Sequence, residues 1–125
     1  MLKWFKKCDS EEGSGLPPAL REIDSTTDLA GLLSADSVMV FKHSTACPVS
    51  WCAHRQVQKF LQQHPGYPLY IVPVIQERAA SNSIAQLTSV RHESPQVILL
   101  KDGSVVAAIS HGEITASQLE RLIAD

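Results

Sequence analysis

The sequence predicts an α/β domain with a central mixed sheet of four to five strands flanked by helices, and three features of the chain indicate this fold class. Short apolar runs alternate with amphipathic segments of helical period, which is typical of parallel strands joined by helices. The run 38–41 is apolar without interruption, as in a strand that is covered on both faces. Asp102-Gly103 lies between two apolar runs and is a two-residue hairpin signal, so the last two strands should be antiparallel.

Strands and helices are expected to alternate up to the closing hairpin and a last helix. The expected strands cover residues 20–23, 38–41, 69–75, 97–100 and 105–109. The expected helices cover residues 26–34 and 49–63, a short segment from Asn82 or Ser83 to Ser89, and a last segment that Thr115 and Gln118 cap. Pro73 lowers the strand tendency at the end of the third strand, and Ser25 with Asp28 resembles a capping pattern.

Composition restricts the classes of function. The 125 residues fit one domain, expected at residues 19–125 behind a flexible tail of residues 1–18 that is rich in Gly, Ser and Pro. The net charge of −2 disfavours nucleic acid and membrane surfaces as partners, and no apolar run approaches the roughly 20 residues that span a bilayer. No secretory signal is recognisable. Three cysteines are too few for a disulfide scaffold, so the simplest expectation is a cytoplasmic protein with reduced thiols.

Cys47 is the leading candidate for a reactive residue. Pro48 suits the first position of a helix, so the thiol should lie where the helix begins. Unpaired backbone N–H groups and the helix dipole favour negative charge there, and a thiol in such a place can react as a thiolate near neutral pH. At about 100° per residue the apolar stripe of the helix faces the sheet, and Cys47 faces solvent with Ser50 and Trp51 beside it.

The motif at Cys47 is monothiol, because Ser50 stands where a Cys-x-x-Cys motif has its second cysteine. A hydroxyl cannot resolve a mixed disulfide, although it can hydrogen-bond a thiolate. Cys52 lies about 140° round the helix from Cys47, so a bridge between them would require unwinding the first turn. Cys52 is therefore expected in a semi-buried packing role or in redox chemistry, and Cys8 as an incidental or a second thiol. Since Cys52 and His54 point about 160° apart, no metal site is expected.

Pro95, in Ser94-Pro95-Gln96, directly precedes a predicted strand. Both an ordinary trans edge proline and a cis bond in a tight turn fit this position. His92 and Glu93 are titratable neighbours that fit either a solvated loop or a functional one.

These pieces together resemble the thioredoxin fold, and within it the monothiol bacilliredoxin family, the bacilliredoxin C group. The resemblance covers about residues 20–123 and rests on these motifs: Lys42-His43-Ser44, Cys47-Pro48-Val49-Ser50, Gln76-Glu77-Arg78, Ile84-Ala85, His92-Glu93-Ser94-Pro95-Gln96, Ser110-His111-Gly112 and Ile114-Thr115. Two features depart from the family pattern: Ala46 stands where threonine is common, and Cys8 and Cys52 are additional.

The resemblance implies a thiol–disulfide oxidoreductase. Cys47 is its nucleophile, supported by His43, Pro48, Ser50 and Trp51. The fold's cis-proline maps to Pro95, and the N–H and C=O of Ser94 could pair with an extended substrate chain. Other substrate-binding candidates are Glu77, Arg78 and His92. The implied partners are S-thiolated client proteins and a low-molecular-weight thiol, with bacillithiol as co-substrate, no bound cofactor, no nucleic acid and no membrane.

The sequence is also compatible with other functions. One is a glutaredoxin-like enzyme that uses glutathione, and another is a dithiol reductase that uses Cys8 or Cys52 as the resolving thiol. A non-catalytic binding module could use the same fold. An iron–sulfur role is disfavoured, because Pro48 removes a backbone donor and the sequence lacks a full set of cluster ligands.

Overall fold

The computed structural model describes residues 20–124, and the expected tail at residues 1–18, with Cys8, lies outside the described residues. A five-stranded mixed sheet forms the centre, in the order β1-β3-β2-β4-β5. β1 and β2 are parallel to β3, whereas β4 is antiparallel to β2 and β5. The strands are β1 (Arg21–Glu22), β2 (Ser37–His43), β3 (Leu69–Pro73), β4 (Gln96–Lys101) and β5 (Ser104–Ser110). The predicted α/β class, mixed sheet and closing hairpin are confirmed.

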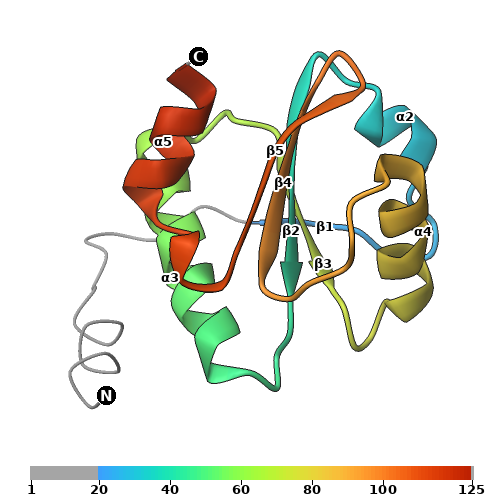
Figure 1. Ribbon diagram of the computed structural model, residues 1–125, viewed down its shortest axis with the longest axis horizontal. Helices are drawn as coiled ribbons and strands as arrows, with labels where there is room; N and C mark the ends of the chain where they lie inside the picture. Colours follow the sequence, from blue (N-terminus) through green and yellow to red (C-terminus); the bar gives the residue numbers. More distant parts are fainter. Residues whose placement is uncertain (1–19, 125) are drawn as a thin grey trace.

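Helices cover both faces of the sheet. In Figure 1, α3 and α5 lie on one face, and α2 and α4 lie on the other. Their bounds are α2 (Leu29–Leu33), α3 (Pro48–Gln63), α4 (Arg78–Thr88) and α5 (Ala116–Ala124), with a short 3₁₀ turn, η1 (His111–Glu113), before α5.

Strand β2 supplies both cores, which explains its uninterrupted apolar run. Successive side chains of a strand point to opposite faces. Met39 and Phe41 belong to the core under α3 and α5, whereas Val38 and Val40 belong to the core under α2 and α4. The same alternation places the next two residues, Lys42 and His43, on opposite sides of the sheet, and both are buried.

Helix α2 begins at Leu29, later than the predicted Thr26. The Asp28 carboxylate accepts a hydrogen bond from the Gly31 N–H and caps the helix. Thr26 belongs instead to a turn in which the Asp24 carboxylate accepts from its N–H and its hydroxyl. The local side-chain hydrogen bonds of Asp24 therefore compete with the helix and displace its start.

Strand β3 ends at Pro73, which the sequence allowed as an alternative to residue 75, and α4 is longer than predicted. β3 ends at Pro73, after which the Glu77 N–H donates to the Pro73 carbonyl and closes a turn. α4 begins at Arg78, before the predicted start at Asn82 or Ser83. Its first residues after Arg78 are alanines, which favour helix strongly but add little to an apolar stripe.

The start of α5 follows the predicted cap, whereas η1 was not anticipated. The Gln118 N–H donates to the Thr115 hydroxyl, as expected from that pair. In η1 the Ser110 and Glu113 side chains form a reciprocal capping box.

One end of the sheet gathers the residues that the sequence singles out. β2 and β3 finish there, β4 begins there, and β5 returns there, so that Lys42, Gln96 and Ser110 share one row across three strands. The start of α3 lies at the same end, at the bottom of Figure 1. Within residues 20–124, no helix is long and apolar enough to cross a membrane.

The β4–β5 turn gives a stability prediction. Asp102 and Gly103 both have positive φ, 52° and 80°, so Gly103→Ala should lower the free energy of unfolding by about 1 kcal/mol or more. Urea denaturation measures this. Gly66→Ala is the matched control, because an added Cβ there meets no atom within 4 Å and the backbone has no positive φ. Equal stability of the two variants would contradict the prediction.

Candidate active site

Cys47 occupies the N-cap of α3, as the sequence predicts. Its backbone is extended, with φ −118° and ψ 121°, and Pro48 takes the first helical position. The Cys47 carbonyl accepts hydrogen bonds from the N–H groups of Ser50 (3.0 Å) and Trp51 (3.2 Å). The Cys47 side chain makes no capping hydrogen bond and is partly exposed as a free thiol. The sulfur therefore lies accessible at the positive end of a sixteen-residue helix.

The first turn of α3 leaves one backbone donor unused. Pro48 has no N–H, and the N–H groups of Ser50 and Trp51 already donate to Cys47. The Val49 N–H has no hydrogen-bond partner within residues 20–124. It is the remaining donor of this turn beside the thiol.

Contacts from two other elements hold the loop before Cys47. The Trp51 indole N–H donates to the Thr45 carbonyl at 3.0 Å, and the Gln76 side-chain amide donates to the Thr45 hydroxyl at 3.4 Å. The Cys47 N–H donates to the Ser44 carbonyl at 3.3 Å. Trp51 is 45% exposed and Gln76 is exposed, so both also line the surface around the thiol.

Ser50 is fully buried, whereas the sequence placed it at the surface beside the thiol. Its hydroxyl lies 2.7 Å from His43 Nδ1 and accepts a hydrogen bond from the Ser44 N–H at 2.9 Å. No hydrogen bond joins the Ser50 hydroxyl to the Cys47 sulfur. The side chain in the second-cysteine position thus fixes the end of β2 and the active-site loop to α3.

His43 lies in an aromatic environment that keeps it neutral. Its ring contacts Trp51 edge-on at 4.5 Å, and it lies 4.9 Å from the His54 ring and 5.5 Å from Phe41. Burial, followed by the neighbouring His54, lowers the pKa of His43 to about 4, against the opposing hydrogen bond to Ser50. The buried His43 Nε2 has no hydrogen-bond partner in the described part of the chain.

The cysteines of α3 are in different states. Cys47 is a free thiol, and Cys52 is disulfide-bonded, so the two are not joined to each other. This agrees with the geometric argument against a Cys47–Cys52 bridge. The bonded state of Cys52 corrects the expectation of reduced thiols throughout, and sequence spacing gives no signal for it.

The Ser94–Pro95 peptide bond is cis, which resolves the alternatives that the sequence left open. The Pro95 carbonyl accepts a hydrogen bond from the His111 N–H at 3.0 Å, so η1 supports this loop. The backbone N–H and C=O of Ser94 lie outside the β4 ladder and have no partner within residues 20–124.

The remaining candidates lie on the loops at the same end. Glu77 is the N-cap residue of α4, and Arg78 begins that helix. The His92 Nδ1 lies 3.1 Å from the buried Lys42 Nζ. Burial, followed by the charges of Lys42 and Arg78, lowers the pKa of His92, although Glu93 opposes this.

Sequence reasoning did not assign roles to four residues that the structure brings to the site: Lys42, Thr45, His54 and His111. The sequence signal for Lys42 was its position directly after the apolar run of a predicted strand, where lysine is unusual. His111 has a positive φ of 54° and lies 4.0 Å from the Glu93 carboxylate, and its signal was the Ser110-His111-Gly112 motif. Among residues 20–124, no group of three or more His, Cys, Asp or Glu side chains is placed to hold a metal ion.

The burial of His43 predicts a pH dependence of stability. Both folded and unfolded His43 are neutral above pH 6.5, and between pH 6.5 and about 4 only the unfolded form takes up a proton. Lowering the pH from 7.5 to 5 should therefore cost up to about 2 kcal/mol of unfolding free energy from this group. Urea denaturation of wild type and His43→Asn at both pH values isolates the difference. Equal pH dependence of the two proteins would contradict the prediction.

Comparison with known proteins agrees with this geometry. The family model described as "Monothiol bacilliredoxin BrxC" matches residues 19–119. A solved structure described as a candidate oxidoreductase with a thioredoxin fold shares 34% identity, with a TM-score of 0.76 over 83% of this chain and 93% of that one.

More distant structures show the same fold. Thioredoxin from Trypanosoma brucei brucei aligns at 14% identity and TM-score 0.69, over 92% of this chain and all of that one. Mitochondrial thioredoxin 3 from Saccharomyces cerevisiae aligns at 21% identity and TM-score 0.66, over 85% and 94% of the two chains. With its thioredoxin fold and its free cysteine at the start of α3, this chain belongs to the monothiol bacilliredoxin family and is a thiol–disulfide oxidoreductase.

Proposed function

We propose that this protein removes bacillithiol, or a similar low-molecular-weight thiol, from S-thiolated proteins through a mixed disulfide on Cys47. The observation that carries the proposal is the free, partly exposed thiol of Cys47 at the N-cap of α3, with a buried serine in place of a partner cysteine. A thiol without a resolving cysteine one turn away can pass its disulfide to a second thiol molecule.

The exchange proceeds in two balanced steps. The Cys47 thiolate attacks the bacillithiol sulfur of the client's mixed disulfide. The S–S bond to the client breaks, and the client sulfur leaves as a thiolate that takes a proton from solvent. A second bacillithiol thiolate then attacks the bacillithiol sulfur held on Cys47, which releases bacillithiol disulfide and the Cys47 thiolate. In the net reaction the client's mixed disulfide is exchanged for bacillithiol disulfide, so the client sulfur is reduced and the second bacillithiol is oxidised.

The first turn of α3 supports the charge that this mechanism needs. The partial positive charge of a helix N-terminus favours an anion, and the Val49 N–H is the donor left unpaired there. His43 contributes no charge near neutral pH, because its pKa is about 4. Stabilisation of the thiolate therefore comes from backbone dipoles at the helix start.

The surface around Cys47 suits an extended client segment. The unpaired backbone N–H and C=O of Ser94, beside cis-Pro95, can pair with a peptide in the manner of an added strand. Trp51 and Ile75, each 45% exposed, offer apolar contacts at the same end of the sheet. A client held by its backbone is recognised with little dependence on its sequence, which suits an enzyme with many substrates.

The dithiol alternative finds little support in this site. Ser50 cannot form a disulfide, and its hydroxyl is already engaged with His43 and Ser44. Cys52 is bonded to a sulfur other than that of Cys47.

Cys47→Ser should reduce removal of bacillithiol from a bacillithiolated test protein to the uncatalysed rate, because an alcohol is not a nucleophile toward disulfides at neutral pH. Release of the client thiol, followed by a chromogenic thiol reagent, measures the rate. Gly66→Ala, changed in the turn after the far end of α3, is the control and should keep wild-type activity. Wild-type activity of Cys47→Ser would end the proposal.

Mass spectrometry of the oxidised protein should find one bacillithiol adduct, located on Cys47, after reaction with the bacillithiolated client. Parallel reactions with a glutathionylated client show which low-molecular-weight thiol is transferred faster. A disulfide between Cys47 and another cysteine of the same chain, in place of the adduct, would establish the dithiol reductase instead.

A further inference from the structure

Lys42 is a buried lysine that has no anionic partner among residues 20–124. It lies next to the end of β2 and is 0% exposed. In the described part of the chain, its Nζ has one hydrogen-bond partner, the His92 ring. Within residues 20–124, no carboxylate is within ion-pair distance of Lys42. Lysine is almost never fully buried unless it is paired, because an uncompensated buried charge is costly.

Arg78 adds a second positive charge near Lys42. Arg78, the exposed first residue of α4, is close enough that its charge and that of Lys42 both lower the pKa of His92. Arg78 also has no ion pair with a carboxylate among the described residues. Glu93 is the acidic neighbour, and its carboxylate lies 4.0 Å from His111 Nδ1. We call Lys42, Arg78 and His92 the cationic cluster.

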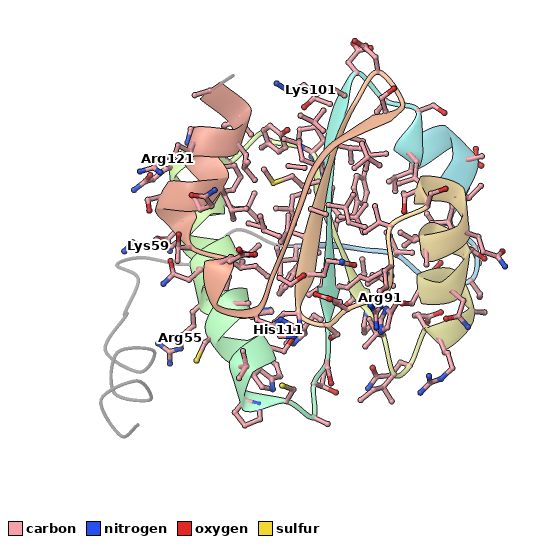
Figure 2. All side chains as sticks on the ribbon, in the orientation of Figure 1. Arg55, Lys59, Arg91, Lys101, His111 and Arg121 are labelled. Carbon is pink, nitrogen blue, oxygen red and sulfur yellow. The ribbon has the colours of Figure 1, made fainter. Side chains whose placement is uncertain are left out.

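The cationic cluster adjoins the loop that carries cis-Pro95. Lys42 pairs across the sheet with Gln96, the residue that follows the proline, and His92 precedes the proline by three positions. The Gln96 side-chain oxygen and the Ser94 hydroxyl are buried and have no partner in the described part of the chain. Figure 2 shows Arg91, the neighbour of His92, toward the same end of the sheet as His111. The Ser94 hydroxyl and the Gln96 side-chain oxygen, which have no hydrogen-bond partner among residues 20–124, therefore lie beside the surface that the proposed function assigns to the substrate.

We infer that the cationic cluster is the binding subsite for the carboxylate groups of the low-molecular-weight thiol. The inference rests on the proposed function in one respect, that Cys47 exchanges with such a thiol. Bacillithiol presents the two carboxylates of its malate portion, and glutathione also has two. The carboxylate accepts hydrogen bonds from the Lys42 ammonium and the Arg78 guanidinium.

Among residues 20–124, the group that hydrogen-bonds the Lys42 amine is the His92 ring, so the inference requires this ring to move. The His92 ring is exposed and lies over the Lys42 amine, with the buried Ser81 hydroxyl 3.4 Å from the same ring nitrogen. Rotation of this side chain uncovers the amine. A carboxylate then replaces a neutral imidazole as the acceptor, and charge-assisted hydrogen bonds are roughly twice as strong as neutral ones. The anion also compensates the buried charge of Lys42.

The first test compares a substrate thiol that has carboxylates with a small one that has none. The same single-cysteine client protein carries either bacillithiol or cysteamine, which presents an ammonium group. Wild type should have a kcat/KM at least about tenfold higher for the bacillithiol adduct. Arg78→Gln should lower this preference about threefold to tenfold, mainly through KM. Arg121→Gln removes a guanidinium from α5, far from the site in Figure 2, and should leave the preference unchanged.

The second test measures the binding of a dicarboxylate in the absence of catalysis. L-malate is titrated into Cys47→Ser protein and followed by amide NMR. Signals of residues 78–81 and 91–96 should shift with malate and not with chloride at equal ionic strength, and Lys42→Met should abolish the shifts. Methionine keeps the length of the buried side chain without its charge. If Lys42→Met does not fold, Arg78→Gln decides the same question.

The outcomes separate the two proposals. If wild type reacts equally fast with both adducts, or Arg78→Gln keeps the full preference and malate causes no local shifts, the subsite is overturned while removal of bacillithiol by Cys47 stands. If wild type reacts with neither adduct, the proposed function is overturned, and malate shifts that depend on Lys42 would still establish the anion site.

Discussion

The hydroxyl of Ser50 joins the end of β2 and the start of the active-site loop to the first turn of α3, and the geometry of the site depends on it. It bonds His43 at the end of β2, the N–H of Ser44 in the loop, and through its own residue the first turn of α3. The contact to His43 is buried and the contact to Ser44 is partly buried, so losing the hydroxyl would leave a ring nitrogen and an amide unpaired, at about 1–3 kcal/mol for a buried group. In a dithiol enzyme the corresponding position holds a reactive sulfur. Here the serine at that position attaches the loop to α3. The same residue therefore accounts for the monothiol motif and for the position of the loop.

The sequence predicted well those elements whose own residues decide their structure. β2 is apolar throughout because it supplies both cores, and the amphipathic stripe of α3 is the stripe that packs on the sheet. The predicted helix starts are wrong where local side-chain hydrogen bonds displace the helix or where alanines leave no apolar period. Asp24 and Asp28 set the start of α2 through local hydrogen bonds, and the alanines at the start of α4 leave no apolar period to detect.

The residues of the candidate site also fall into those that local motifs predict and those that only the packing brings together. Cys47 and Pro95 could be found from local motifs, since each is marked by its immediate neighbours. Lys42 and His92 are fifty positions apart, and their contact exists because β2 and β4 pair in one particular register. His43 and Ser50 are only seven apart, yet their bond depends on how the loop between them folds. Pairings of this kind are a product of packing, so a single sequence contains no direct signal for them.

The last two residues of β2 lie on opposite faces of the sheet, and they differ in charge. His43 points toward α3 and is held neutral by burial among aromatic rings, so it neither repels nor attracts a charged substrate. Lys42 points toward α4, where burial lowers its pKa and its hydrogen-bond partner is a neutral ring. An anion placed beside Lys42 would stabilise its protonated form, and a neutral His43 leaves the charge on the Cys47 sulfur to the helix dipole alone. The alternation of one strand thereby places the helix start that favours a thiolate and the cationic cluster on opposite faces of the sheet.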